Sequence, residues 1–543
     1  MPTTNFVASA SRDTDYAAPG SGAARAIWPK LILFLFLAFV ITERVLVVDK
    51  PFSKDVAAMT VMAHGMSAGR PLYSDFVEIR PPVVMVSFEA AEKVAGYGRQ
   101  TIVLIYVVYA GLTLLGVYYA GSVNSAGPIG GLCAVAFWAL LSNSGEIQGG
   151  DPNTELFMNL YQVWAFAFFL RLREDSSRSL VIVTGIFFLL ASFTKQLAVI
   201  VPLSLGIVYV GYGFFQSSAV KARVKQILAI AGIGALGWIL MIAYFALTHR
   251  LQIFRELIFV DSLDYAAGKG ALAVNRTGTF RVLLRNVLAP LFREAEFVPN
   301  VMNPLAALVG LGAIPGLIAH RLRWLLLFAF SVATWLELSL SGQYYPHYYQ
   351  LWLIPLCVGG GWAISDAREL LQRWRVGWLA FVAGIVVFVV LLSSQIRWYR
   401  MDYEHRWPGL ATEDMLATQP LAEEINQLLK PDEAIYEWGS NSAFYIYTNR
   451  QAPTGILWAK LLYGGSLGDS LSQRAISDLE KIKPEIAIVA KASLPDHENN
   501  AVLRWIYQNY EVLPADADRG PFVVYMRRGG ALEQRIRNKT IGN

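Results

Sequence analysis

Eleven apolar runs, most of them about 17–22 residues long, follow one another along the chain and constrain its fold more than any other feature. A run of this length crosses the hydrocarbon core of a bilayer as an α-helix. We therefore expect a polytopic α-helical membrane protein with about 11 transmembrane helices. The expected spans are 28–48, 100–121, 126–142, 153–171, 179–194, 197–215, 227–248, 302–319, 324–341, 348–365 and 376–395.

Charged residues divide the chain into two parts. Residues 397–543 hold 36 charged side chains among 147 residues, whereas the first 396 residues hold only 51. The second part alternates helical and strand patterns, which is typical of a small α/β domain. The expected domains are a disordered cytoplasmic tail at 1–27, a transmembrane domain at 28–396 with long outer loops at 49–99 and 249–301, and an extracytoplasmic α/β domain at 397–543.

The overall composition excludes several classes of protein. Hydrophobic residues make up 55% of the chain and charged residues 16%, against about 25% charge in soluble proteins; this excludes a soluble enzyme and a disordered chain. A net charge of +5 gives no reason to expect a nucleic-acid partner. Cys133 and Cys357 both lie in apolar runs, so they predict buried thiols rather than a disulfide or a metal pair.

Lys and Arg residues are concentrated in alternate short loops. If the N-terminus is inside, the short outer loops 142–152, 194–196 and 342–347 contain only Lys195, whereas the inner segments contain fourteen Lys and Arg residues. This asymmetry follows the positive-inside rule and predicts a cytoplasmic N-terminus. The odd number of spans then places the C-terminal domain outside the cytoplasm.

Several charged residues stand in the expected outer loops. Asp55 lies in the first turn of an expected surface helix at 53–69, where it either complements the helix dipole or acts as a general base. Arg80 precedes the Pro81-Pro82 helix start and either meets lipid headgroups or holds a phosphate, because guanidinium groups match phosphate oxygens. Lys195 breaks the charge asymmetry near membrane depth, which makes it a functional candidate.

Two further groups of residues allow both structural and functional interpretations. Asp151 and Glu155 flank the start of a span, where helix capping explains them as well as binding does. His347 stands among tyrosines that are typical of an interfacial belt. The six histidines of the chain show no metal-ligand spacing.

Taken in order, these motifs resemble the GT-C type of integral-membrane glycosyltransferase, and the resemblance covers nearly the whole chain. The similar groups are the bacterial lipid A aminoarabinose transferases and the protein O-mannosyltransferases. The motifs are Asp55, Gly69, Tyr73-Ser-Asp75-Phe and Glu78-Ile-Arg-Pro-Pro82 in the first outer loop, then Asp151-Pro-Asn-Thr-Glu155, Phe193-Thr-Lys-Gln196 and Tyr345-Pro-His-Tyr348, and finally Ile435-Tyr-Glu-Trp-Gly439 and Lys483-Pro-Glu-Ile-Ala-Ile-Val489 in the outer domain.

The resemblance implies a function at the outer face of a bacterial inner membrane. Such enzymes move a sugar from a polyprenyl-phosphate donor to a hydroxyl group of a lipid, glycan or protein acceptor, with inversion and with Asp55 as the general base. The implied donor phosphate-binding residues are Arg80, Lys195, His347, Tyr73 and Tyr345. The implied sugar- or acceptor-binding residues are Glu78, Asp75, Asp151 and Glu155.

The chain departs from the family pattern at two positions, and two other functions compete with this one. Asp55 is followed by Val-Ala-Ala instead of a second acid, which leaves open whether a divalent cation takes part, and Arg80 replaces a more usual Lys. A flippase or transporter for a lipid-linked sugar predicts charges near the bilayer midplane and repeat symmetry. A non-catalytic scaffold predicts no cluster of an acid with phosphate-binding cations.

Overall fold

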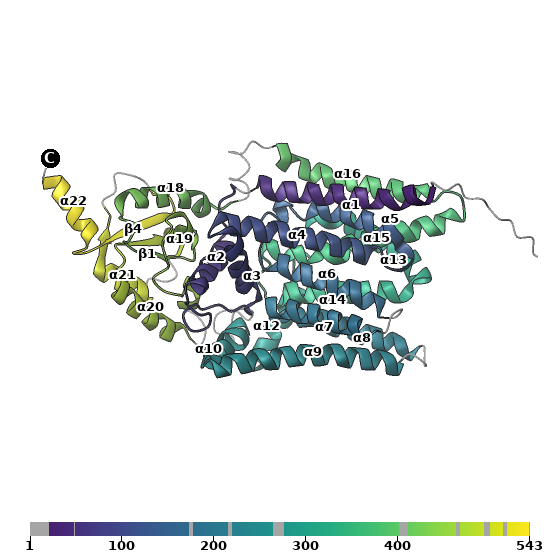
Figure 1. Cartoon of the computed structure of the whole chain (residues 1–543), viewed down its shortest axis with the longest axis horizontal. Helices are drawn as coiled ribbons and strands as arrows, with labels where there is room; N and C mark the ends of the chain where they lie inside the picture. The colour runs from purple at the N-terminus through teal and green to yellow at the C-terminus, as the bar shows by residue number, and fades with distance from the viewer. Residues whose placement is uncertain are drawn as a thin grey trace, which may run out of the picture.

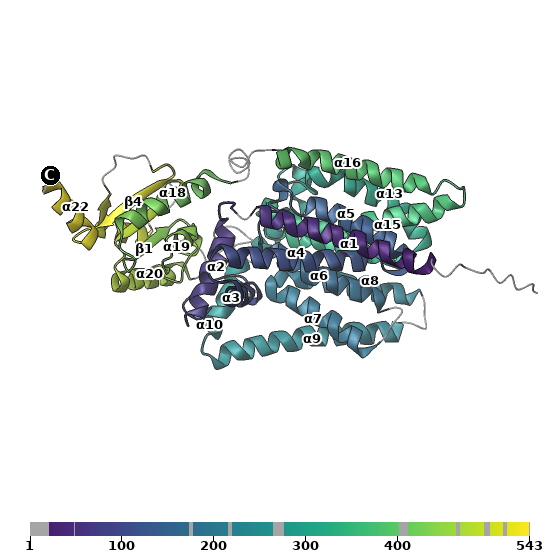
Figure 2. The same cartoon turned by 45° about the horizontal axis from the view of Figure 1, so that its top comes forward.

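The computed structural model describes residues 21–47, 49–172, 177–215, 220–263, 276–400, 411–462, 467–493, 500–513 and 519–541. It consists of a bundle of long helices and an α/β domain at one end of that bundle, with the shorter helices α2 and α3 between the two (Figures 1 and 2). The expected division into a helical body and a C-terminal α/β layer is therefore present in the structure.

Helices occupy every apolar range that the sequence marks. They are α1 (Ser21–Leu46), α4 (Arg99–Gly121), α5 (Gly127–Leu141), α6 (Thr154–Arg171), α7 (Arg178–Thr194), α8 (Ile200–Phe214), α9 (Val220–Leu247), α13 (Asn303–Ala319), α14 (Arg321–Ser339), α15 (Leu353–Gln372) and α16 (Trp378–Arg400). Within the described residues, six helices are long and apolar enough to cross a membrane by themselves. The chain is thus a multi-pass membrane protein, and the count of eleven spans stays a prediction.

The first helix begins earlier than the sequence predicted. Helix α1 starts at Ser21, inside the expected tail of 1–27, because Ala23 and Ala24 are strong helix formers that extend it before the apolar run. The rest of the expected tail, residues 1–20, lies outside the described residues.

Small residues let three helices of the bundle approach closely. A Cβ added to Gly361 of α15 would lie 2.2 Å from the carbonyl oxygen of Gly130 in α5, and one added to Gly130 would lie 2.7 Å from the carbonyl oxygen of Gly121 in α4. Backbone contact of this kind is typical of helix packing in membranes, where close van der Waals contact replaces the hydrophobic drive. The α4, α5 and α15 group therefore forms a rigid base for the loops at its ends.

The first outer loop folds into α2 (Lys54–Ser67) and α3 (Val83–Ala95). The sequence predicted that the first of these lies on the membrane surface with one exposed face. This prediction is wrong: nine residues of α2 are buried, on every side of the helix. The outer domain covers the side that was expected to face water, through contacts between α2 and α19 (Ala443–Tyr447).

The second long outer loop, 249–301, is only partly helical. It contains α10 (Leu251–Arg255), a π-helical turn (Glu256–Asp261) and α12 (Arg276–Leu288). Short 3₁₀ turns complete the described part of the membrane domain: Asn124–Ala126, Gly145–Ile147, Gln196–Val199, Ala289–Phe292, Asn300–Met302 and Pro346–Trp352.

The C-terminal domain is a four-stranded mixed sheet with helices on its two sides (Figure 1). Its strand order is β1-β2-β4-β3; β1 pairs parallel with β2, and the other two pairs are antiparallel. Every residue of β1 and β2 is buried, which explains why both strands are nearly unbroken apolar runs. The elements are α18 (Glu413–Leu428), β1 (Ile435–Trp438), α19, a 3₁₀ turn (Ala459–Leu462), α20 (Gly468–Ile482), β2 (Ile486–Ala490), a second turn (Lys491–Ser493), α21 (Ala501–Asn509), β3 (Tyr510–Val512), β4 (Phe522–Arg527) and α22 (Ala531–Ile541).

Candidate active site

A carboxylate and a guanidinium form an ion pair at the junction between the membrane helices and the outer domain. Asp55, in the first turn of α2, lies 2.7 Å from the guanidinium of Arg80 through its Oδ1 atom. Glu78 lies 3.5 Å from the same guanidinium. The side chains of Asp55 and Arg80 keep 27% and 21% of their exposure, and that of Glu78 only 1%. The pair is therefore open to a ligand, whereas Glu78 is fixed behind it.

The backbone around Arg80 is held in place by Tyr73 and Glu78. Tyr73 has a φ of +59°, a strained value for a residue with a side chain, and such strain is common at functional sites. Its hydroxyl donates to the carbonyl oxygen of Arg80 at 2.5 Å, and its ring packs edge-on against Phe245 and Phe254. The backbone N–H of Arg80 donates to Glu78 at 3.1 Å. Burial, reinforced by the charge of Glu78, raises the pKa of Tyr73 well above its ordinary value, so the phenol remains a donor.

Three cations act on Asp55 from different parts of the chain. Burial raises the pKa of the Asp55 carboxyl, but the charges of Arg80, His347 and Lys195 and the hydrogen bond from Arg80 outweigh it. The net effect is a pKa below the ordinary value, so Asp55 is ionised at neutral pH. Arg80 in turn has a raised pKa, because the charges of Glu78 and Asp55 outweigh its burial. The structure thus brings Arg80 into contact with Asp55 and places Lys195 and His347 within electrostatic reach of it, while the roles of the four residues stay predictions.

Lys195 and His347 approach the site from loops at the ends of two long helices. Lys195 follows the last residue of α7 in an extended conformation, with its ammonium 3.4 Å from Glu155 and 4.1 Å from the centre of the Tyr348 ring. The imidazole of His347 lies 3.0 Å from the side-chain oxygen of Gln148 and is stacked with the Tyr345 ring. Contacts with the Tyr348 ring and the Glu155 carboxylate therefore fix the position of the Lys195 ammonium.

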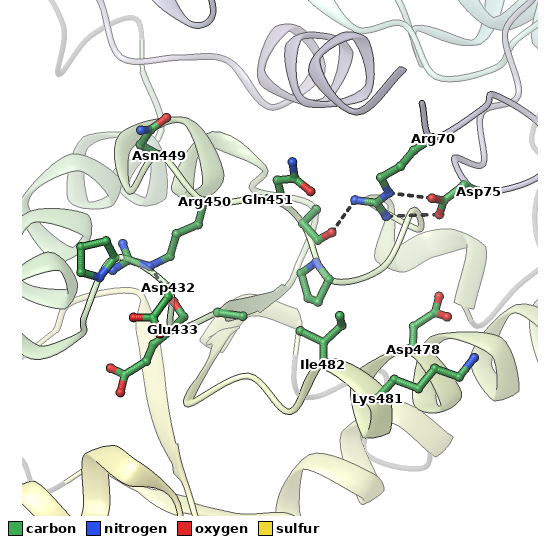
Figure 3. Close-up of a pocket in the computed structure, with 14 residues that line it drawn as sticks. Arg70, Asp75, Asp432, Glu433, Asn449, Arg450, Gln451, Asp478, Lys481 and Ile482 are labelled. Atoms are coloured by element: carbon green, nitrogen blue, oxygen red, sulfur yellow. Dashed lines mark hydrogen bonds and ion pairs between the residues drawn. The ribbon is translucent and has the colours of Figure 1, made fainter. Parts of the chain in front are cut away.

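Two residues predicted to bind sugar or acceptor lie apart from this cluster. Asp151 forms an ion pair with Lys50 at 2.6 Å, at the outer end of α1. Asp75 forms a two-pronged pair with Arg70, at 2.6 and 3.2 Å, and is shown with that residue in Figure 3. Glu78 and Glu155, in contrast, contact the cations of the cluster directly.

The outer domain contributes a residue that the sequence did not reveal. The indole N–H of Trp458 donates to Glu78 at 3.1 Å, and the Arg80 guanidinium lies 5.6 Å from the centre of the same ring. Beside it, Lys54 at the start of α2 pairs with Asp414 of α18 at 2.6 Å. No local pattern marks Trp458, because its partner is 380 positions away in the sequence.

Glu337 is a second residue that the sequence analysis missed. It is buried near the outer end of α14, where both of its oxygens accept from the Gln162 amide, at 2.7 and 3.0 Å. An acid inside an apolar run is a signal that a search for intramembrane charges would have found.

Metal-binding geometry is not present in the part of the chain that the structure describes. Within those ranges, no group of three or more His, Cys, Asp or Glu side chains is arranged to hold an ion. The second acid beside Arg80 is Glu78, and its two oxygens accept from an indole N–H and a backbone N–H.

Comparison with known proteins gives a likeness in structure but none in sequence. No family model and no curated protein matches the chain. The structure of ArnT from Cupriavidus metallidurans bound to undecaprenyl phosphate superposes with a TM-score of 0.56 and 12% identity, over 94% of this chain and 98% of ArnT. ArnT in the apo state gives a TM-score of 0.58 and 13% identity, over 92% and 98%. The fold that the sequence motifs predicted is confirmed: over nearly its whole length the chain has the fold of ArnT, a GT-C glycosyltransferase.

Proposed function

We propose that the chain is a membrane glycosyltransferase that transfers a sugar from a polyprenyl-phosphate donor to an acceptor hydroxyl. The observation that carries this proposal is that one partly exposed, ionised carboxylate, Asp55, lies within electrostatic reach of the cations of Arg80 and Lys195 and of the His347 imidazole. The reaction needs both kinds of group: a base for the acceptor and positive charge for the leaving phosphate. Undecaprenyl phosphate is bound in one of the ArnT structures that share this fold.

In this reaction Asp55 removes the proton of the acceptor hydroxyl while that oxygen attacks the anomeric carbon of the donor sugar. The bond between the anomeric carbon and the phosphate oxygen breaks, and its electron pair leaves with the polyprenyl phosphate. Because attack and departure occur on opposite faces, the configuration at the anomeric carbon is inverted. A positioned general base contributes about 10²–10⁴ in rate.

The cations stabilise the charge that the phosphate gains as the bond breaks. Arg80 is suited to this task, because its guanidinium lies beside Asp55 and its side chain keeps 21% of its exposure. A hydrogen bond to a charged group contributes about 1.5–3 kcal/mol, and the contribution to rate grows when the contact strengthens in the transition state. Lys195, held by Glu155, and His347, stacked on Tyr345, add to this field, while Tyr73 fixes the backbone of Arg80.

The membrane topology sets the side on which the reaction occurs. Asp55 belongs to α2, which stands between the bundle and the C-terminal domain (Figure 2), and the charges of Lys195 and His347 act on it. From the Lys and Arg asymmetry of the loops, we infer that the end of the bundle next to α2 faces away from the cytoplasm of a bacterial cell and that the N-terminus is inside.

The proposal is tested by following labelled sugar from a polyprenyl-phosphate donor in purified protein and in lipid extracts. We expect Arg80→Ala and Lys195→Ala each to lose at least tenfold in turnover. The matched control is Lys93→Ala, which removes an exposed cation of α3 that pairs with Glu89 in the preceding turn. A deletion strain should accumulate the lipid-linked donor. Wild-type turnover in both site variants would show that these cations do not act on the leaving phosphate.

A further inference from the structure

A cleft of about 570 Å³ lies between the first outer loop and the C-terminal domain, beside the candidate active site. Its volume falls in the range of about 300–1,000 Å³ that is usual for small-molecule sites. Figure 3 shows Arg70 and Asp75 of the first outer loop on one side and Asp432, Glu433 and Arg450 of the outer domain on the other. Two different parts of the protein therefore form this cleft together.

The walls of the cleft are fixed by charged groups that already have partners. Arg70 binds Asp75 and donates to the carbonyl oxygen of Ala452 at 2.7 Å. Arg450, only 8% exposed, donates to the carbonyl oxygens of residues 430, 433 and 448. The carboxylate of Glu433 is paired with Arg535 at 2.6 Å. These groups give the cleft a defined shape and leave little charge for a ligand.

The side chains exposed along the cleft are mainly hydrogen-bonding groups. Asn449 and Gln451 supply amides, Asp432 a carboxylate and Lys481 an ammonium, and all four are exposed. Amides both donate and accept, so they suit hydroxyl groups, which do the same. In total the lining carries three cationic and four acidic side chains, which does not favour a strongly charged ligand.

The cleft is connected to the catalytic residues through two stretches of chain that run side by side. Asp75, in its wall, is five residues before Arg80, which is at most about 18 Å for an extended chain. Opposite, the segment that starts at Ala452 contacts the loop again where Gly455 accepts from the backbone N–H of Val77 at 3.1 Å, and it ends at Trp458. A ligand of several linked units that occupies the cleft is therefore long enough to extend past this contact toward Asp55.

We propose that this cleft binds an uncharged, hydroxyl-rich part of the acceptor, so that the acceptor is a carbohydrate chain. Calling this ligand the acceptor rests on the proposed function, but the binding of carbohydrate in the cleft does not depend on catalysis. It follows that the acceptor has a water-soluble portion held outside the bilayer, whereas the donor lipid is held by the membrane helices.

The test uses the full chain in detergent and the double variant Asp432→Ala/Gln451→Ala. The probes are neutral oligosaccharides of two to six glucose, galactose, mannose or rhamnose units, and binding is measured by saturation-transfer NMR and calorimetry. The matched control is Glu480→Ala/Gln508→Ala, which removes an exposed acid and an exposed amide of the same domain outside the cleft. Losing hydrogen bonds from two side chains should weaken binding at least tenfold, and the control should bind as the wild type does.

The outcomes separate this proposal from the proposed function. Binding of a neutral oligosaccharide by the wild type and by Asp55→Asn, with loss in the cleft variant alone, supports the cleft even if no transfer is ever observed. Absence of binding to every neutral probe, equal binding by the cleft variant, or tighter binding of oligogalacturonate would overturn it.

Discussion

Replacing Asp55 by Asn keeps the size of the side chain and removes its ability to accept a proton. The Asp55 carboxylate pairs with Arg80 at 2.7 Å, and both side chains remain between one fifth and one third exposed. Loss of a solvent-screened pair of this kind costs about 0.2–1 kcal/mol, and loss of an acid in a first helical turn about 0.3–1 kcal/mol. Arg80 keeps Glu78 as a partner, so no buried charge is left alone.

These magnitudes predict opposite effects on stability and on rate. The total structural cost of about 0.5–2 kcal/mol is small beside an unfolding free energy of about 5–15 kcal/mol, so Asp55→Asn should fold. If Asp55 is the base, turnover should fall about 10²–10⁴-fold, which corresponds to about 3–5 kcal/mol of barrier. Donor binding should be unchanged or tighter, because Arg80 no longer shares its charge with Asp55.

The assay measures transfer of labelled sugar from a polyprenyl-phosphate donor, with donor affinity measured separately on the same preparation. Because Arg80, His347 and Lys195 lower the pKa of Asp55 against the effect of burial, protonation of Asp55 should cause no fall in wild-type kcat/KM between pH 7 and pH 5. Asp55→Asn that transfers at nearly the wild-type rate would remove Asp55 from the mechanism. Weaker donor binding with unchanged kcat would instead make Asp55 a binding residue, and Glu78 the next acid to test.

Three further predictions follow from the outer domain and the topology. Trp458→Phe keeps an aromatic ring beside Arg80 but loses the hydrogen bond to Glu78, so donor affinity should fall about three- to tenfold while the fold is retained. Trp458→Leu should lower donor affinity further. Wild-type donor affinity in both variants would show that the indole does not position Arg80. Burial raises the pKa of Glu437 to about 8, so the folded protein keeps a proton on this carboxyl that the unfolded chain releases above its ordinary pKa near 4.5. The free energy of unfolding therefore falls as the pH rises from about 4.5 to 8. Glu437→Gln should raise the thermal midpoint at pH 8 more than at pH 5, and an equal change at both pH values would contradict the raised pKa. Cysteines at Glu146 and Ser470 should react with an impermeant reagent outside intact cells and one at Lys221 should not; labelling of Lys221→Cys from outside would overturn the topology.

Hydropathy and short motifs predicted the helices and the central cations because both depend on local sequence. The split of 179–215 into two helices at Lys195 follows from the length limit on one crossing, and α7 does end at Thr194. Strands β1, β2 and β4 could be predicted from short, mainly apolar runs, whereas β3, with three residues, was too short to be recognised.

Side-chain partners could not be predicted in the same way, because they depend on contacts between distant parts of the chain. Ser53 stands at the N-cap position of α2, where a serine hydroxyl usually accepts from the helix backbone, but its hydroxyl makes no capping hydrogen bond and is buried without a partner. Asp151 was grouped with the sugar-binding acids by its place before a span, yet Lys50, a residue with no motif, pairs with it. In both cases the residue type and its position could be read from the sequence, whereas its hydrogen-bond or ion-pair partner could not be predicted.

The contact between Trp458 and Glu78 has a consequence for the biosynthesis of the protein. The two residues are 380 positions apart, and a ribosome adds about 5–20 residues per second, so about 20–75 seconds separate their synthesis. In the proposed topology, the loop with Asp55 and Arg80 has already crossed the membrane during that time, while the segment that contains Trp458 has not yet been made. The proposed active site therefore stays incomplete until Trp458 has been exported, so we expect the onset of activity to be coupled to the last part of translation.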